Sequence, residues 1–495
     1  MKQKKAITSS ERPEREIRLE KLQALRAQHL EPYPARVRRD LTLAAVEKDF
    51  LNLDGKKFFV VGRVRSLRRH GKIIFLHIED GTGKMQLVLQ FNVLGQHVYR
   101  TLENFLDIGD FLEVYGNPYV TKKNEHSLLV HSLRIIAKAL RPIPDTWYGL
   151  KDDEERYRRR YLDILVNPDV AEIIVKRSKF WKSIRDFMFA EGFMEVETPV
   201  LENTTGGADA VPFATHHNSL NIDVYLRISA GELWQKRLMV AGFEKTFEIG
   251  RIFRNEGMSA EHLQDYTQLE FYWAYADYGK GMEFVERLYK HVARETFGTL
   301  QFHIRDFDVD LGKAWPRYDF RETLIEHTGV DVLKTSLSAV LQKLQARNIQ
   351  CEDSLTLPRA LDQLWKSVRK SIAGPGFVIH HPVFLSPLAK RTEHNPELVE
   401  RFQSIIAGTE IGNGYTELNN PIDQAERFQE QAALRAQGDL EAQMPDYDFV
   451  EALEYGMPPT CGFGVSERLF AFLMNRSVRE CVLFPLLRPK VKKVL

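Results

Sequence analysis

The sequence has few cysteines and no long hydrophobic run, and both absences limit what the protein can be. Only Cys351, Cys461 and Cys481 occur among 495 residues, and they form no Cys-x-x-Cys pair. A disulfide framework is therefore not indicated, and we expect a cytoplasmic protein. No apolar run approaches the roughly 18–20 residues that cross a bilayer. The basic start of the chain lacks the apolar core of a signal peptide, so we expect no membrane partner.

Two common phosphate-binding motifs are also missing. Neither Gly-x-Gly-x-x-Gly nor Gly-x-x-x-x-Gly-Lys-Thr occurs, so neither a dinucleotide-binding fold nor a P-loop is indicated. The net charge of +1 gives no overall preference for a polyanion. The length of 495 residues, with 43% hydrophobic and 28% charged residues, is typical of a globular protein of two or three domains.

Positive charge is concentrated in residues 56–79, where Glu79 is the only acid. The basic residues of this segment are Lys56, Lys57, Arg63, Arg65, Arg68, Arg69 and Lys72. Such a patch can neutralise phosphates, although a solvated charged face has the same composition. Phe75 lies within the patch, either to stack on a nucleotide base or simply as part of the core.

The spacing of apolar residues predicts a small β-barrel near the N-terminus. Five short strands are expected at residues 58–61, 73–78, 85–89, 111–114 and 128–130, with a helix over residues 98–106. This arrangement is typical of a five-stranded barrel of the OB type. We expect residues 1–50 to be a helical extension that is at most weakly packed, residues 51–142 to form the barrel, residues 143–168 to be a linker, and residues 169–495 to form a second domain.

One predicted hairpin places an arginine beside several acids. Residues 247–257 form a strand that ends before a glycine turn, and residues 267–273 form the strand that follows. The polar side chains available to one ligand are Arg254, Glu256, Glu270 and Tyr272. An arginine fork can hold a carboxylate and a phosphate oxygen together. The alternative is a structural ion-pair network, although burying that much charge without a ligand is costly.

Two glycine-rich stretches further along extend this picture. In residues 410–418, a strand period puts Asn413, Tyr415 and Glu417 on one face, with Glu410 on the other, suited to a different partner such as a metal ion. The alternative is an edge strand with exposed polar groups. In residues 462–468, a strand delivers Arg468 to the start of a helix, where it can meet a triphosphate, although a tight strand-to-helix turn also explains the glycines. The three stretches together indicate an enzyme that uses ATP to activate a small carboxylic acid.

These stretches resemble the signature motifs of class II aminoacyl-tRNA synthetases, and among them the lysine-specific members. The resemblance covers residues 57–489. Its strongest tokens are Phe253-Arg254-Asn255-Glu256-Gly257, Glu155-Arg156-Tyr157-Arg158-Arg159-Arg160-Tyr161-Leu162-Asp163, Ser386-Pro387-Leu388-Ala389-Lys390-Arg391 and Tyr455-Gly456-Met457-Pro458-Pro459. The implied fold class is α+β, with an OB-type barrel that reads the tRNA anticodon and a catalytic domain of antiparallel sheet flanked by helices. The segment ending at Pro199 would build a homodimer interface.

The resemblance also assigns site residues. Arg254 and Arg468 would be catalytic, and the ATP-binding residues would be Arg254, Glu256, His262, Tyr266, Glu410 and Arg468. The lysine-binding residues would be Gly207, Glu232, Glu270, Tyr272, Asn413, Tyr415 and Glu417. Glu410 and Gln403 would hold Mg²⁺, and the anticodon would be contacted by Arg65, Phe75 and Gln86. The expected partners are ATP, L-lysine and tRNA(Lys).

The acids support the choice of lysine independently, because a site with Glu232, Glu270 and Glu417 suits a substrate with two ammonium groups. The sequence departs from the family pattern at Gln403, where the family has an acid. The glycine motif before Arg468 is one residue short, and residues 228–232 carry one residue more. Two rival functions remain: a ligase that lysylates a protein or small molecule, and a regulatory paralogue that only binds RNA.

Overall fold

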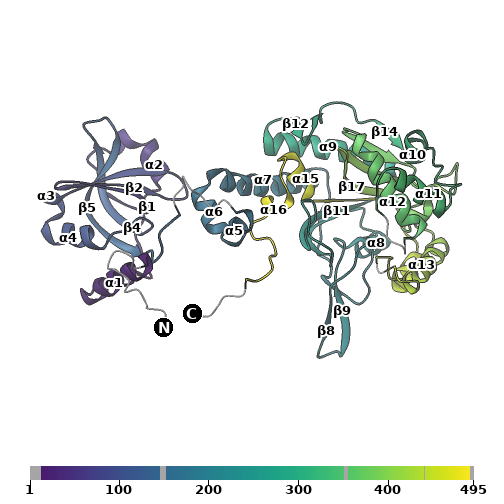
Figure 1. Ribbon diagram of the computed structural model, residues 1–495, viewed down its shortest axis with the longest axis horizontal. Coiled ribbons are helices and arrows are strands. Elements are labelled where there is room, and N and C mark those ends of the chain that lie inside the picture. The colour runs from purple at the N-terminus through teal and green to yellow at the C-terminus, as the bar shows by residue number, and fades with distance from the viewer. Residues whose placement is uncertain (1–12, 145–151, 351–354, 440, 491–495) are drawn as a thin grey trace, which may run out of the picture. The chain divides into compact units, whose positions relative to one another are not determined.

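The computed structural model describes residues 13–144, 152–350, 355–439 and 441–490 (Figure 1). The chain divides into two compact units, residues 1–150 and 151–495. Residues 145–151 of the expected linker and Cys351 lie outside the described residues. No helix in the described part of the chain is long and apolar enough to cross a membrane.

The first unit is built on a closed barrel with strand order β1-β2-β3-β5-β4, which confirms the predicted five-stranded barrel. Along β2, buried and half-buried residues alternate, because one face meets the core and the other meets solvent. The elements are β1 (Phe58–His70), β2 (Ile73–Glu79), β3 (Lys84–Gln90), α3 (Phe91–Leu94), α4 (Gln96–Phe105), β4 (Phe111–Val120) and β5 (His126–Ala137).

Three N-terminal elements pack on this barrel: α1 (Glu14–Ala27), α2 (Leu43–Lys48) and the short 3₁₀-helix η1 (Phe50–Leu53). Leu25, Leu43 and Val46 are buried in the same apolar cluster as the barrel strands. The helical spacing in this region was predicted correctly, but the expectation of weak packing is wrong. The apolar face of these helices covers the barrel core, so the first unit begins well before residue 51.

The second unit is built on an eight-stranded sheet of order β14-β15-β16-β17-β18-β11-β10-β6. Its pairs are antiparallel except β14 with β15 and β10 with β6 at the two ends. The strands are β6 (Met194–Glu195), β10 (Lys245–Phe253), β11 (Asp265–Ala274), β14 (Arg317–Asp319), β15 (Gly376–Ile379), β16 (Arg401–Ile406), β17 (Thr409–Thr416) and β18 (Thr460–Ser466). The predicted antiparallel sheet is confirmed.

Helices cover the apolar face of this sheet. The long helices α7 (Pro168–Ala190) and α9 (Tyr278–Phe297) pack there through one large core that includes Phe180, Phe284, Phe271 and Phe463. The other helices are α8 (Glu232–Val240), α10 (Phe320–Thr328), α11 (Leu337–Ala346), α12 (Leu357–Val368), α13 (Pro421–Ala436), α14 (Tyr447–Glu454), α15 (Arg468–Leu473) and α16 (Val478–Cys481). Smaller elements are β7 (Leu201–Glu202), β8 (Ala214–His217) and β9 (Ile222–Leu226), which form a three-stranded sheet, the pair β12 (Gln301–Ile304) and β13 (Phe307–Asp310), and the 3₁₀-helices η2 (Arg369–Ser371) and η3 (Val383–Leu385).

Much of the expected linker belongs to the second unit. Residues 153–158 and 160–166 form helices α5 (Asp153–Arg158) and α6 (Arg160–Val166). Arg160 is buried, lies 2.9 Å from Asp163, and donates to the backbone carbonyls of Glu480 (2.7 Å) and Val482 (3.0 Å). A buried guanidinium needs such partners, and here they tie α6 to the C-terminal segment.

Leu43→Ala is expected to destabilise the barrel, because Leu43 has no exposed surface and its removal leaves a cavity. The cost should be about 2–5 kcal/mol. Hydrogen exchange should become faster in β1, β2 and β3 and stay unchanged in the second unit. Leu51→Ala is the control, because Leu51 is 81% exposed. Equal exchange in both variants would contradict the packing described for α2.

Candidate active site

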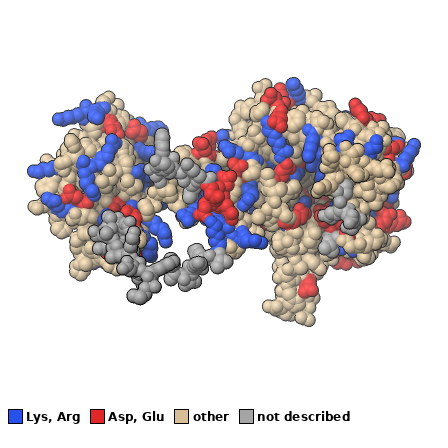
Figure 2. Space-filling view, in the orientation of Figure 1, with Lys and Arg blue, Asp and Glu red and all other residues tan. Residues whose placement is uncertain are grey.

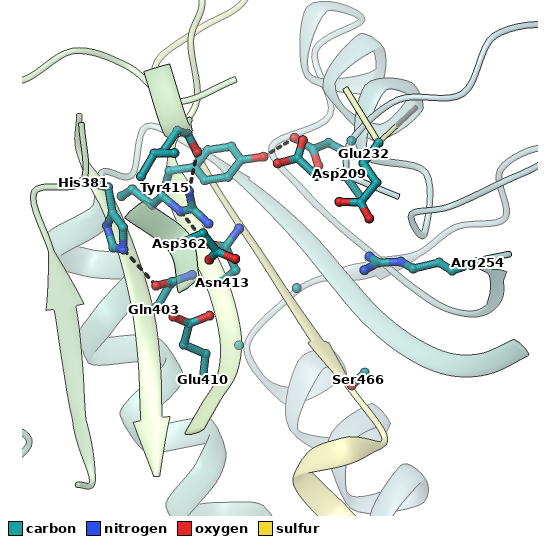
Figure 3. Close-up of a pocket in the computed structure, with 18 of the residues that line it drawn as sticks. Asp209, Glu232, Arg254, Asp362, His381, Gln403, Glu410, Asn413, Tyr415 and Ser466 are labelled. Carbon is teal, nitrogen blue, oxygen red and sulfur yellow. Dashed lines mark hydrogen bonds between the residues drawn. The ribbon is translucent and has the colours of Figure 1, made fainter. Parts of the chain in front are cut away.

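A cavity of about 570 Å³ lies over the polar face of β16, β17, β18 and β11 (Figure 3). It is lined by all of the site residues expected in the second domain: Gly207, Glu232, Arg254, Glu256, His262, Tyr266, Glu270, Tyr272, Gln403, Glu410, Asn413, Tyr415, Glu417 and Arg468. These residues come from stretches more than 200 positions apart in the sequence, so the fold brings together what the sequence left scattered.

The floor of the cavity is strand β18, which presents glycines between larger side chains of its neighbours. Gly462 pairs with Tyr272 on one side and Tyr415 on the other. A Cβ added at Gly462 would lie 2.1 Å from Glu417 Oε1 and 2.6 Å from the ring of Tyr272. Gly464 pairs in the same way with residues of β11 and β17. The glycines of this strand therefore make room for the site, in addition to leading into α15.

Three carboxylates gather at one end of the cavity, and all are buried: Glu232, Glu270 and Glu417. Glu270 Oε1 accepts hydrogen bonds from the backbone N–H of Ala230 (2.7 Å) and from Gln268 Nε2 (2.5 Å). Burial, followed by repulsion from Glu232, raises the pKa of Glu270 to about 7, and these hydrogen bonds oppose the rise.

Glu232 and Glu417 share a cation that sequence analysis missed. The ammonium of Lys236 lies 2.7 Å from Glu232 Oε1 and 2.5 Å from Glu417 Oε2. Tyr415 Oη also donates to Glu232, and Gly207 lies directly against the Glu232 side chain (Figure 3). Burial raises the pKa of Glu417, and Lys236 opposes that rise. The i, i+4 spacing of Glu232 and Lys236 was a signal in the sequence for this pair.

The arginines lie at the other end of the cavity. Arg254 follows β10, and its Nε donates to the carbonyl of Ile228 (3.3 Å) while its guanidinium lies 5.8 Å from the centroid of the Tyr266 ring. Arg468 is the first residue of α15, and it donates to the carbonyl of Glu410. Its Nε is buried without a hydrogen-bond partner among the described residues. Such an orphaned cationic donor in a cavity is suited to an anionic ligand.

Two predicted nucleotide residues lie near these arginines. Burial lowers the pKa of His262, and the charge of Arg468 lowers it further, so the imidazole is neutral at pH 7. Its Nδ1 lies 2.7 Å from Ser259 Oγ. Burial raises the pKa of the Glu256 carboxyl, and the nearby Arg254 opposes this rise. Both side chains line the same cavity as Arg254.

Glu410 faces the cavity although strand parity separates it from Asn413. The pairing of β16 with β17 shifts so that Ser404 faces Gly412 while Ile405 faces Glu410. This bulge adds one residue to β17 and reverses the alternation, which sequence parity alone does not reveal. The expectation that Glu410 lies on the face opposite to Asn413 is therefore wrong: both side chains line the common cavity (Figure 3).

Other side chains of the cavity were not anticipated from the sequence. Trp365 Nε1 donates to Glu410 Oε1 (2.8 Å), and Arg369 lies 3.3 Å from Glu410 Oε2. Arg401 Nε donates to Asn413 Oδ1 (2.8 Å). Trp365 comes from α12, far from any of the recognisable motifs, and no local pattern pointed to it.

Gln403 pairs with a buried histidine. His381 Nε2 lies 2.8 Å from Gln403 Oε1, and burial lowers the pKa of His381 far below its usual range, so the ring is neutral. Within the described part of the chain, no group of three or more His, Cys, Asp or Glu side chains is arranged to hold a metal ion.

The barrel residues expected to contact RNA share one outer face. Phe75 pairs with Arg68 on β1 and is half-buried, pointing away from the core residues Ile74 and Leu76. Gln86 on β3 pairs with His77 and is buried. Arg65 lies 2.8 Å from Glu79. Figure 2 shows Lys and Arg side chains on the surface of this unit. The structure thus places Phe75 outside the core.

Two family models match this chain, one in each of its two compact units. The family described as tRNA synthetases class II (D, K and N) matches residues 152–488, and the OB-fold nucleic acid binding domain matches residues 58–136. The chain is 43% identical over 484 residues to a protein named lysine–tRNA ligase from Thermotoga maritima, with 96% of each chain covered. It is also 43% identical over 479 residues to a lysine–tRNA ligase from Carboxydothermus hydrogenoformans, covering 96% of this chain and 98% of the relative. With a family model over most of its length and relatives at this identity, the chain belongs to the class II tRNA synthetases of the D, K and N type.

Proposed function

We propose that this protein is a lysine–tRNA ligase that activates L-lysine with ATP and transfers it to the 3′ end of tRNA(Lys). The observation that carries the proposal is one cavity with three buried carboxylates at one end and, away from them, Arg254 and Arg468 among the arginines that line it. The acidic end suits the two ammonium groups of lysine. The arginine end suits a carboxylate next to a triphosphate. The names of the relatives agree with this substrate.

The reaction has two steps. A lysine carboxylate oxygen attacks the α-phosphorus of ATP, the bond to the β-phosphate oxygen breaks, and lysyl-adenylate and pyrophosphate form. A terminal ribose hydroxyl of tRNA then attacks the lysyl carbonyl carbon, loses its proton, and AMP leaves. Chemistry of this kind depends on positioning and charge stabilisation. Arg254 would hold the substrate carboxylate and the α-phosphate, and Arg468 the γ-phosphate.

The remaining groups would bind and orient the substrates. Tyr266, beside Arg254, would stack on adenine, with Glu256 and His262 next to the nucleotide. Glu270, Glu417 and Tyr272 would hold the side-chain ammonium of lysine, and Glu232 with the backbone of Gly207 would hold the α-ammonium. Asn413, held by Arg401, would contact the lysine carboxylate. The ring of Tyr415, whose hydroxyl donates a hydrogen bond to Glu232, would close the lysine pocket.

Mg²⁺ would bind together with ATP, at the end of the cavity where the triphosphate would lie. It prefers oxygen ligands and commonly combines one or two protein groups with substrate phosphates and water. Glu410 and Gln403 present such oxygens from neighbouring strands, and each oxygen engaged by Trp365 or His381 retains a second lone pair. When bound, Mg²⁺ would offset negative charge on the phosphates. Glu410 and Gln403 would hold it only together with ATP.

The barrel face of β1, β2 and β3 is proposed to bind the tRNA anticodon, with Phe75 as a stacking platform and Arg65 and Gln86 beside it. Its half-buried, outward-facing aromatic ring and the basic residues of β1 support this role. A cytoplasmic location belongs to the same proposal. A regulatory paralogue that only binds RNA would not need Arg254 and Arg468, and a ligase that ignores tRNA would not need this face.

Lysine-dependent exchange between ATP and pyrophosphate tests the activation step. Arg254→Ala should lower kcat by about 10²–10³, because it removes a positive charge from the site where negative charge develops. Arg251→Ala is the matched control, since Arg251 is an exposed arginine three residues away that pairs with Asp265. Absence of exchange with every amino acid in the wild type would refute the enzyme, and comparable exchange with aspartate would refute the acidic-pocket argument.

Phe75→Ala should leave this exchange unchanged and raise the KM for tRNA(Lys) in charging. Loss of one base stack costs about 1–3 kcal/mol, or roughly 5- to 150-fold. Val120→Ala on β4 is the control, because Val120 is also apolar and exposed. Unfolding of the barrel in Phe75→Ala, seen by circular dichroism, would favour a core role. Exchange without any tRNA charging by the wild type would favour a ligase with another acceptor.

The same proposal includes a homodimer. Several large apolar side chains are exposed along the segment that ends near Pro199: Val175, Phe189, Met194, Val200 and Leu201. Exposed large apolar side chains are typical of a subunit interface when they gather in one part of a chain. Val175→Asp should shift the protein toward monomer in sedimentation velocity, since Val175 is 68% exposed on α7. Ile422→Asp, on exposed α13, should have no such effect. A monomeric wild type would refute the dimer.

A further inference from the structure

Lys236 is a buried cation inside a site that is otherwise acidic. Its side chain has no exposed surface, and its ammonium contacts one oxygen of Glu232 (2.7 Å) and one of Glu417 (2.5 Å). The aromatic rings of Tyr415 and Phe449 lie 5.4 Å and 5.8 Å from it. The residues that line the cavity include both carboxylates but not Lys236. The ammonium therefore lies behind the two carboxylates.

Because Lys236 lies behind Glu232 and Glu417, the other oxygens of these carboxylates can still bind a ligand in the cavity. Lys236 takes up one oxygen of each carboxylate. Both oxygens of Glu417 are buried without a geometrically good hydrogen bond among the described residues, and Oε2 has its ion pair with Lys236, so Oε1 is the oxygen left for a ligand. A buried carboxylate oxygen without a partner is costly, and a cationic ligand removes that cost. A simple structural ion pair between α8 and the end of β17 would not require both partners to face the cavity.

The charges of this end can be counted. When the three carboxylates (Glu232, Glu270 and Glu417) and the ammonium of Lys236 all carry their charges, as they would around bound lysine, this end has a net charge of −2, that is −3 plus +1. Lysine brings two ammonium groups, and its carboxylate faces Arg254 in the proposed function. The ammonium of Lys236 thus balances one of the three carboxylate charges. The two ammonium groups of lysine balance the other two, so no carboxylate stays buried without a counter-charge.

We propose that Lys236 is a positioning residue, an internal counter-ion that pairs with Glu232 and Glu417, orients them, and matches the charge of the pocket to a diammonium amino acid. The inference rests on the proposed function and deepens it. In this role Lys236 acts through Glu232 and Glu417 and does not itself touch the substrate.

The pH dependence of lysine use follows from the groups around this ammonium. Glu232 faces it from α8, Glu417 and Tyr415 from β17 and its end, and Glu270, Tyr272 and Cys461 lie on the neighbouring strands β11 and β18. A carboxylate must be ionised to bind an ammonium, so kcat/KM for lysine should fall on an acid limb set jointly by Glu270, whose pKa is about 7, and by Glu417, whose pKa burial raises. Loss of the Lys236 charge raises the pKa of Glu417, since Lys236 now lowers it, and moves this acid limb to higher pH.

The experiment uses the full-length protein and exchange kinetics from pH 6 to 9. Lys236→Gln removes the charge but keeps hydrogen-bond donors, and Lys236→Arg keeps the charge. Lys236→Gln should raise the KM for lysine about tenfold at pH 7 and move the acid limb up by about one pH unit. Its KM for ATP should stay within about twofold of the wild type, and Lys236→Arg should keep the wild-type acid limb. Lys138→Gln is the matched control: Lys138 is equally buried and pairs with Asp107 and Asp110 in the barrel.

Each outcome decides the inference. A Lys236→Gln enzyme with wild-type KM for lysine and wild-type acid limb, but lower thermal stability, would make Lys236 a structural ion pair only. If Lys236→Gln does not fold, Lys236→Arg carries the test, and an acid limb displaced by one unit in that variant would overturn the inference. Wild-type protein without lysine-dependent exchange would refute the proposed function itself, whereas altered variants beside an active wild type bear on Lys236 alone.

Discussion

The absence of side chains along one strand is the constraint on which the site depends. β18 lies between β17 and β11, and its cavity-facing positions are Gly462 and Gly464. The neighbouring strands carry large polar side chains at the paired positions, so the glycines open a channel whose floor is backbone. A Cβ at Gly462 would meet the Glu417 carboxylate and the Tyr272 ring. The cavity is thus deep at this place because the central strand contributes no side-chain volume at Gly462 and Gly464.

The opposite face of the same strands explains why the channel keeps its shape. Phe271, Phe463 and Phe402 pack beneath it against α9, in the largest apolar core of the chain. Close packing of this kind resists small displacements. Alternation along each strand therefore serves two purposes at once: apolar residues fix the sheet against the helices, and the residues between them line the cavity. Glu270 lies on β11, Arg254 and Glu417 directly follow β10 and β17, and Glu232 and Arg468 begin helices α8 and α15, so all of these charged groups are held by regular elements.

Periodicity in the sequence revealed those features that depend on a single strand or a single helix. It predicted the barrel strands, the hairpin of β10 and β11, and the shared face of Asn413, Tyr415 and Glu417. It failed where a second element decides the outcome. The bulge that turns Glu410 into the cavity arises from the pairing with β16, and the docking of Leu43 depends on the barrel core. The contact of Trp365 with Glu410 joins elements that no sequence motif connects. Lys236 carried a usable local signal, its spacing from Glu232, but its second partner comes from a distant strand.

The two ends of the cavity follow different electrostatic rules, and this difference is informative about its ligands. At the acidic end, the protein supplies its own counter-ion, which pairs with Glu232 and Glu417 and orients them before a ligand arrives. At the phosphate end, Glu410 already contacts Trp365 and Arg369, and Gln403 brings no charge, so in the proposed function ATP supplies most of the negative charge that attracts a divalent cation. In the proposed function, the amino-acid pocket is therefore preorganised by the fold, whereas the metal site is completed by ATP. Affinity for Mg²⁺ then depends on the bound nucleotide, and selectivity for lysine depends on the protein alone.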